Sequence, residues 1–274
     1  MSLSMALRAA RGDGIAGRCG ADGGLASPAV VCFEGPDAAK FLHGQVTNDV
    51  VGLEVGQGNL SARVSRTGHL QAVFSVHRVA EDTLWLLCAA EDADALYEHL
   101  EAFHFADDLR IYLLDAAEPW ALIQGPAVAQ VLLDRGAQVW ADGLVFNDGP
   151  GVVLGRSLTG DRGLVLRGPS SWLGEWLDAA RRSSLTLLDV AGLSAAIETL
   201  RIETGLLRTV LELKKRRLLP GTGLEQRAVS YSKGCYLGQE VISRVRTYGN
   251  VPWALRALLF RDDCLDALEA PARS

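Results

Sequence analysis

The order of secondary structure elements in the first half of the chain limits the fold class most strongly. Alternating apolar residues predict strands at 28–33, 58–64, 69–77, 83–88 and 108–114. Helical spacing predicts one helix that opens at Pro36 and another that begins at Glu91. Several strands therefore follow one another with no helix between them. A doubly wound parallel sheet needs regular strand–helix alternation, so this order predicts an α+β fold.

Composition excludes several classes of protein. The 274 residues include no run of about 18 apolar residues, so we expect no membrane-spanning helix. The start of the chain has no long apolar core of the kind a secretory signal needs. The cysteines are scattered singly, without C-x-x-C or Cys/His pairs at zinc spacing, at Cys19, Cys32, Cys88, Cys235 and Cys264. This pattern predicts free thiols in a reducing compartment, a cytoplasmic location and no metal site.

Basic residues are concentrated in one segment of an otherwise acidic chain. Residues 201–246 hold ten Lys and Arg against four Asp and Glu, a local excess of +6, whereas the whole chain carries −6. A basic island predicts a local anionic ligand, so we expect no direct nucleic-acid partner. For Lys214–Arg217 a simple solvated charge run is an equally good interpretation.

The stretch that carries most of the chemistry runs from Lys233 to Glu240. It places the Cys235 thiol two residues from an ammonium, between two glycines and just before a predicted helix. A nearby ammonium and a helix N-terminus both favour the thiolate, and glycine lets a ligand approach the backbone closely. If the segment is extended, Lys233 and Cys235 leave the same face. A buried structural cysteine beside a surface lysine is the simpler interpretation of these residues taken alone.

The same stretch reads K-G-C-Y-L-G-Q-E and resembles the K-G-C-Y-x-G-Q-E signature of the YgfZ family of folate-binding proteins. That family is related to the glycine-cleavage T-protein, an aminomethyltransferase. Three other stretches are similar to family motifs and occur in the family's order: F-L-H-G-Q-V-T-N-D-V at 41–50, T-G-D-R-G at 159–163 and R-I-E-T-G at 201–205.

This resemblance implies a T-protein-like discontinuous body of two subdomains around a central cavity that holds tetrahydrofolate or another folate. It also implies a C-terminal β-barrel, which is truncated here because about 25 residues follow Gly249. We therefore divide the chain into a flexible start (1–27), a first α+β subdomain (28–118), a second (119–188), a segment that returns to the first subdomain with the motif (189–252), and a barrel remnant (253–274).

The resemblance also assigns site residues. Lys233 and Cys235 form the functional pair, Glu203 contacts the pterin, and Arg244 or a basic residue from 208–227 meets the glutamate tail. The other expected cofactor-binding residues are Asn48, Gln71, Tyr236, Gly238, Gln239 and Glu240.

Gln71 decides between two related activities. Aminomethyltransferases have a carboxylate after the G-x-L that matches Gly68-His69-Leu70, and glutamine cannot act as a charged acid or base. The resemblance therefore implies an accessory protein without conventional enzyme activity. It would use folate to support assembly or repair of iron–sulfur clusters, and so tRNA-modification enzymes, with iron–sulfur enzymes or assembly proteins as partners. The alternatives are a folate-dependent one-carbon transferase and a binding module that has lost folate.

Overall fold

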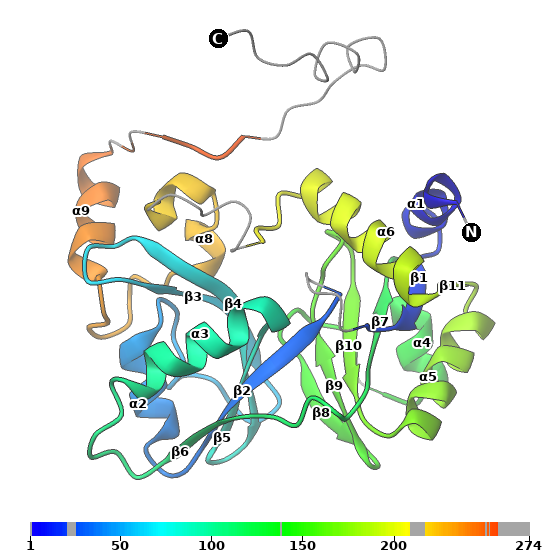
Figure 1. Ribbon diagram of the computed structural model, residues 1–274, viewed down its shortest axis with the longest axis horizontal. Coiled ribbons are helices and arrows are strands. Elements are labelled where there is room, and N and C mark those ends of the chain that lie inside the picture. The colour runs from blue at the N-terminus through cyan, green and yellow to red at the C-terminus, as the bar shows by residue number, and fades with distance from the viewer. Residues whose placement is uncertain are drawn as a thin grey trace, which may run out of the picture.

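The computed structural model describes residues 2–20, 26–137, 139–208, 217–249, 251 and 253–256. Two sheets lie side by side, and each carries helices on its outer face (Figure 1). The predicted α+β class is confirmed. Among the described helices, none is both long and apolar enough to cross a bilayer.

The first sheet is antiparallel throughout, and its outer face carries helices α2 (Ala38–Gln45) and α3 (Ala90–Glu101). Alternation along one central strand shows how it is covered: Val31 and Phe33 pack beneath these helices, whereas Val30 and Cys32 face the second sheet. Its strands, in spatial order, are β3 (Gly58–Val64), β4 (Leu70–Ala80), β5 (Thr83–Ala89), β2 (Pro28–Glu34) and β6 (Arg110–Leu113).

The second sheet is antiparallel except for one short parallel pair at its edge. Helices α4 (Val128–Asp134) and α5 (Ser170–Arg182) cover its outer face, where Trp172 and Trp176 are buried and both donate to Asp148. Its strands, in spatial order, are β11 (Thr186–Leu187), β1 (Ile15–Arg18), β7 (Trp120–Gln124), β10 (Gly163–Arg167), β9 (Gly151–Gly155) and β8 (Val145–Asp148).

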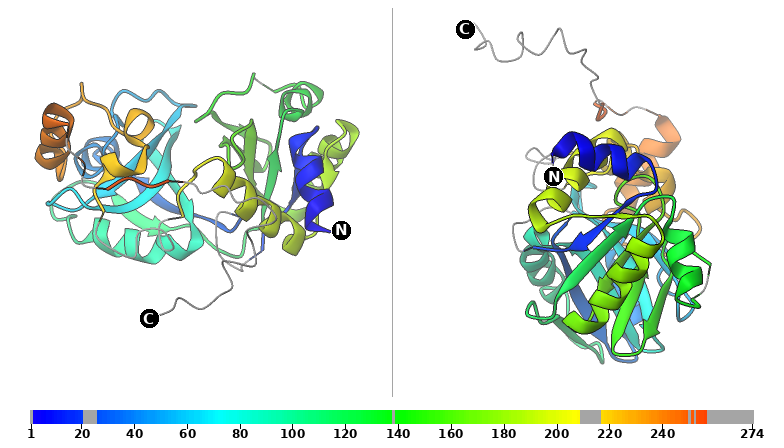
Figure 2. Two further views of the ribbon diagram at one scale, coloured as in Figure 1. Left: turned by 90° about the horizontal axis from the view of Figure 1, so that it is seen from above. Right: turned by 90° about the vertical axis from the view of Figure 1, so that its right-hand side faces the viewer.

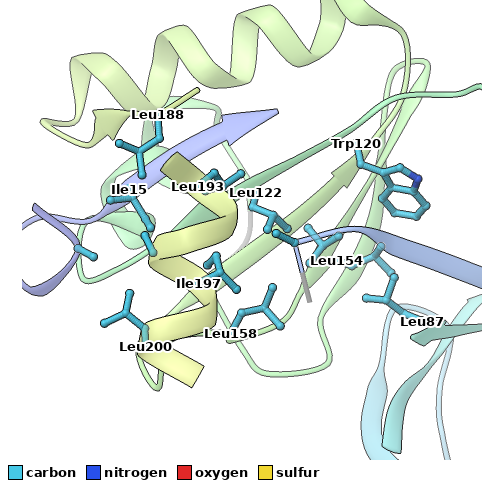
Figure 3. Close-up of a cluster of buried hydrophobic side chains, with 14 of the residues drawn as sticks. Ile15, Leu87, Trp120, Leu122, Leu154, Leu158, Leu188, Leu193, Ile197 and Leu200 are labelled. Carbon is cyan, nitrogen blue, oxygen red and sulfur yellow. The ribbon is translucent and has the colours of Figure 1, made fainter. Parts of the chain in front are cut away.

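A shared core joins the two sheets. Helix α6 (Val190–Glu203) buries Leu193, Ile197 and Leu200 against the inner face of the second sheet, at the spacing of one helical face (Figure 3). Leu87, from β5 of the first sheet, belongs to the same cluster. Burial of one continuous apolar core fixes the sheets relative to each other.

The start of the chain differs from the prediction. Instead of a flexible segment, residues 3–18 form helix α1 (Leu3–Arg11) and strand β1, and α1 lies alongside α6 (Figure 2). Ala6 and Ala10, four residues apart, are buried there, and β1 is bonded on both edges, to β7 and β11. The buried residues are alanines in a stretch rich in Gly, Ala and Arg, a composition from which the sequence predicted a flexible start. Residues 21–25 lie outside the described part.

The C-terminal part packs against the first sheet. A 3-10 turn, η1 (Leu219–Thr222), and helices α8 (Glu225–Ala228) and α9 (Gln239–Tyr248) cover the inner side of β3 and β4 (Figure 1). The connection from α6 to residues 233–240 therefore includes two short helical turns, and residues 209–216 lie outside the described part. The predicted barrel remnant falls mostly on residues 257–274, also outside it, and residues 253–256 contain no strand.

Candidate functional site

The two longest family-like motifs, at 41–50 and 233–240, lie against each other although about 190 residues separate them. The Lys233 ammonium donates to the carbonyl oxygens of His43 (2.5 Å), Val46 (2.8 Å) and Asn48 (2.8 Å). The Leu237 amide donates to the Gly44 carbonyl at 3.1 Å. The C-terminal end of a helix exposes carbonyls without intrahelical partners, and a lysine satisfies them well. The first motif therefore holds the second in place.

Lys233 points into the protein and Cys235 points out. The lysine is buried, and burial lowers its pKa to about 8, an effect that Asp49 partly opposes. Cys235 is an exposed free thiol. In the described part of the chain, no hydrogen bond joins the two side chains. All three ammonium hydrogens have carbonyl partners, so the structure gives Lys233 the role of securing residues 233–238, which we call the Cys235 loop.

A histidine borders this loop. A Cβ built on Gly234 would lie 3.9 Å from His43 Nε2. His43 Nδ1 accepts from the amides of Val50 and Val51 at 3.3 Å each, and it also lies 3.3 Å from Asp49 Oδ1. Burial, and secondarily the charge of Lys233, lower the pKa of His43. Chain folding thus brings His43 beside the backbone of the Cys235 loop, although the two are far apart in the sequence.

The residues that follow Cys235 shape the turn into α9. Gly238 has a φ of +78°, and a Cβ there would lie 2.3 Å from the Ser65 carbonyl oxygen. Gln239 Oε1 accepts from the Tyr236 amide at 3.3 Å. The Tyr236 ring lies under the Lys233 ammonium at 5.1 Å, and its hydroxyl is buried with no partner among the described residues. Backbone approach and turn geometry explain this part of the motif.

The other predicted cofactor-binding residues are dispersed. Glu240 and Arg244 pair with each other at 2.7 Å on the exposed face of α9, and Glu203 pairs with Arg11 of α1 at 2.5 Å. Gln71 Oε1 is buried without a partner in the described part. Asn48 Nδ2 donates to the carbonyls of Leu60 (2.7 Å) and Arg227 (3.2 Å). The structure therefore does not gather the predicted set around one opening.

A cavity of about 410 Å³ lies where loops of the second sheet meet α8, and we call it the Trp140 cavity. Of the residues predicted to bind the cofactor, only the range 208–227 reaches its wall, through Arg227. The lining residues are Trp140, Asp142, Ser157, Gly160, Asp161, Arg162, Thr204, Leu206 and Arg227. The T-G-D-R-G motif at 159–163 supplies part of this wall, through Gly160, Asp161 and Arg162, none of which was predicted to bind the cofactor.

The wall of the Trp140 cavity offers polar groups of both signs. Arg227 lies 3.4 Å from Asp142 across it, and Trp140 Nε1 donates to the Gly163 carbonyl at 2.9 Å, which orients the ring. The hydroxyl of Ser157, a lining residue, and that of Thr159, which directly precedes the lining residue Gly160, are buried and have no partner among the described residues. Buried polar atoms normally find hydrogen-bond partners, so these hydroxyls suit a polar ligand or ordered water.

Asn48 links the cavity to the Cys235 loop. Its side chain binds the carbonyl of Arg227, a cavity residue, while its own carbonyl accepts from Lys233. Thr47 adds a second link, because its hydroxyl donates to the Ala228 carbonyl at 2.5 Å. Residues 47 and 48 therefore contact both the α8 segment at the cavity wall and the lysine that secures the Cys235 loop.

Comparisons with known proteins give distant relatives, and no family model matches the chain. It is 27% identical over 239 residues to a chloroplastic protein of Arabidopsis thaliana named as a transferase. It is 26% identical over 245 residues to the mitochondrial aminomethyltransferase of Solanum tuberosum. Each match covers 82% of this chain, but the chain spans only 52% and 59% of those two relatives.

Among solved structures, the glycine cleavage system aminomethyltransferase T of Bartonella henselae is similar with a TM-score of 0.75. The match covers 90% of this chain and 67% of that one, at 20% sequence identity. The chain has the T-protein fold. The predicted T-protein-like fold is confirmed by this similarity. The two subdomains around a central folate cavity, their boundaries and the YgfZ-specific resemblance stay predictions.

Proposed function

We propose that this protein binds tetrahydrofolate in the Trp140 cavity and supports iron–sulfur cluster assembly or repair through the Cys235 loop. The observation that carries the folate part is the cavity itself: a T-protein fold with a polar opening of about 410 Å³ whose wall includes Ser157, a residue with a buried hydroxyl that has no partner among the described residues. Small-molecule sites typically have volumes of roughly 300–1,000 Å³.

The residues of the cavity fit a folate chemically. The amino-pyrimidine edge of a pterin donates hydrogen bonds, which Asp142 or Asp161 could accept. The glutamyl tail is anionic, and Arg162 and Arg227 line the same wall. Trp140 supplies an aromatic face for the ring system. When bound, tetrahydrofolate would supply one-carbon or redox chemistry that no side chain of this site provides.

The iron–sulfur part of the proposal rests on the K-G-C-Y-L-G-Q-E resemblance and on the position of Cys235. Its thiol is exposed on a loop that Lys233 secures to the end of α2. A thiol that is exposed on a well-fixed loop can be reached by a partner protein, whereas a thiol in a closed pocket cannot. The partners would be iron–sulfur enzymes, such as tRNA methylthio-transferases, or assembly proteins.

A folate-dependent one-carbon transferase is the second candidate, and the similarity to the potato aminomethyltransferase favours it. Gln71 argues against it, because a carboxamide cannot exchange a proton as a charged acid or base. An assay for methylene-tetrahydrofolate formation from an aminomethyl donor separates the two: turnover would support the transferase, and binding without turnover supports the accessory role.

Tryptophan fluorescence tests where folate binds. We expect 5-formyl-tetrahydrofolate, a stable reduced folate, to quench the emission of the wild-type chain in a saturable way, since Trp140 lines the cavity. Trp140→Phe should lose most of this quenching. Trp253→Phe, whose ring packs on Gly221 and Arg217, is the matched control and should keep it. Equal quenching in both variants would place the ligand elsewhere.

Replacing Cys235 tests the thiol. Because the side chain is exposed, Cys235→Ala should leave the melting temperature unchanged. In cells that lack the native protein, the variant should fail to restore the activity of a tRNA methylthio-transferase. The neighbouring exposed substitution Ser232→Ala should restore it fully. Full rescue by Cys235→Ala would remove the thiol from the proposed function.

A further inference from the structure

Strand β6 is an open edge of the first sheet (Figure 1). It pairs with β2 along one side only. The Leu114 amide donates to the Val30 carbonyl at 3.0 Å, and hydrogen-bonded pairs alternate with non-bonded pairs along an antiparallel ladder. Ile111 and Leu113 therefore direct their backbone N–H and C=O groups away from β2. Among the described residues, these four groups have no hydrogen-bond partner.

The strand at the opposite end of this sheet is protected. The carbonyl of Ala62 in β3 accepts from the Thr47 amide, and its amide donates to the Thr47 hydroxyl, both at 3.0 Å. The Leu60 carbonyl of the same strand accepts from the Asn48 side chain. At the edge of the second sheet, β8 donates to the Gly56 carbonyl. Proteins normally cover or bond their edge strands because an open edge can pair with another strand, so β6 differs from these two edges.

A groove of about 530 Å³ borders the open edge. Its walls come from the C-terminal end of α3, through Glu101 and His104, and from residues 109–112. Phe105, which follows His104, is 87% exposed, and Leu113 is 37% exposed. A strand added along β6 would satisfy the open backbone groups and place its own side chains against that of Leu113. The edge therefore offers both hydrogen bonds and apolar contact to an extended segment.

The charges beside the edge favour one kind of occupant. Arg110, the basic residue of β6, is already paired with Glu34 at 2.7 Å. Asp107 and Asp108 come directly before the strand, and Asp37 lies beside them, since its carboxylate accepts from the Asp108 amide. In the described part of the chain, these three carboxylates form no ion pair. A second copy of this chain would bring the same acidic surface against itself, whereas a basic segment would complement it.

We propose that β6 accepts an extended, basic segment of a partner protein as an added edge strand. This inference goes beyond the proposed function, because the Trp140 cavity and the Cys235 loop include no residue of this edge. Main-chain hydrogen bonds from Ile111 and Leu113 supply affinity, as in other cases of strand addition. The acidic residues before the strand select for basic side chains.

The probe is a fluorescein-labelled peptide, Lys-Val-Lys-Ile-Lys-Val-Lys, and fluorescence anisotropy measures its binding. The full wild-type chain should bind it saturably, and about tenfold or more tightly than the same peptide with Glu in place of Lys. Leu113→Pro removes an N–H that faces away from β2, a position where an edge strand tolerates proline, and should weaken binding about tenfold or more. Leu113→Ala keeps that N–H and should stay within about threefold of wild type. Asp108→Asn should weaken binding, whereas Asp178→Asn, on α5 of the other sheet, should not.

A second peptide keeps the test valid if Leu113→Pro folds poorly. It has the same sequence with N-methyl groups on alternate residues, which block pairing along one side of the peptide, and the wild-type chain should not bind it. Equal binding of the two peptides would mean adhesion by charge alone and would overturn the inference. So would the absence of saturable binding at millimolar peptide, or a dimer of the free chain in sedimentation that Leu113→Pro abolishes, which would assign the edge to a second copy. Quenching by folate should be the same in all these variants, so these outcomes leave the proposed function unaffected.

Discussion

Lys233→Met is expected to lower the free energy of unfolding by about 3 kcal/mol or more, because it leaves buried carbonyl groups without a hydrogen-bond donor. Methionine keeps most of the length and volume of lysine but donates no hydrogen bond. The carbonyls of His43, Val46 and Asn48 would lose the ammonium that now satisfies them at the end of α2. Urea denaturation, followed by circular dichroism, gives the change as a shift of the midpoint at constant slope.

Lys40→Met is the matched control, because Lys40 is an exposed residue of the same helix. It should change the free energy of unfolding by less than about 0.5 kcal/mol. The pH profile of Cys235 alkylation, measured on both variants, tests the alternative role of Lys233. Unchanged stability in Lys233→Met with a thiol that alkylates only at higher pH would contradict the structural assignment and restore the predicted Lys233–Cys235 pair.

Gly143→Ala is expected to lower the free energy of unfolding about as much as Lys233→Met, because it forces two backbone segments apart. Gly143 has a φ of +87°, and a Cβ there would lie 2.0 Å from the Gly58 carbonyl oxygen and 2.5 Å from its carbon. The next contact, from the Val145 amide to the Gly56 carbonyl at 2.9 Å, joins β8 to the loop before β3. Neither backbone can move without a large cost in free energy. We therefore expect Gly143→Ala to lower the free energy of unfolding by about 3 kcal/mol or more.

Gly149→Ala is the control that separates the effect of a steric clash from the effect of a positive φ. Gly149 also has a positive φ, +57°, but nothing lies within 4 Å of a Cβ built there. Its replacement should cost only about 1 kcal/mol, the penalty of the left-handed conformation. The difference between the two melting temperatures measures the contact between the sheets. Equal losses in the two variants would mean that Gly58 and Gly143 do not touch in solution.

Much of the fold was predictable because apolar alternation is a local property. The strand predicted at 58–64 coincides with β3, and the helix predicted to begin at Glu91 is α3, which begins at Ala90. Helix α1 was not predicted, because its buried residues are alanines within a segment that is rich in Gly and Ala. The strand after it is held by partners far along the chain, β7 and β11, which no local pattern reveals.

The site was predictable only in part. The motif around Cys235 was found, but the partners of Lys233 come from a helix end about 190 residues earlier, and only the fold shows that they use all three of its donors. The Trp140 cavity is built from loop residues of separate elements, without a common spacing.

A crystal structure of the full chain with 5-formyl-tetrahydrofolate tests the central claim most directly. The account predicts ligand density in the opening bordered by Trp140, Ser157 and Arg227, with the thiol of Cys235 still exposed on its loop. Folate bound at another surface, or an opening that stays free of folate at millimolar ligand in crystals and in solution, would contradict it.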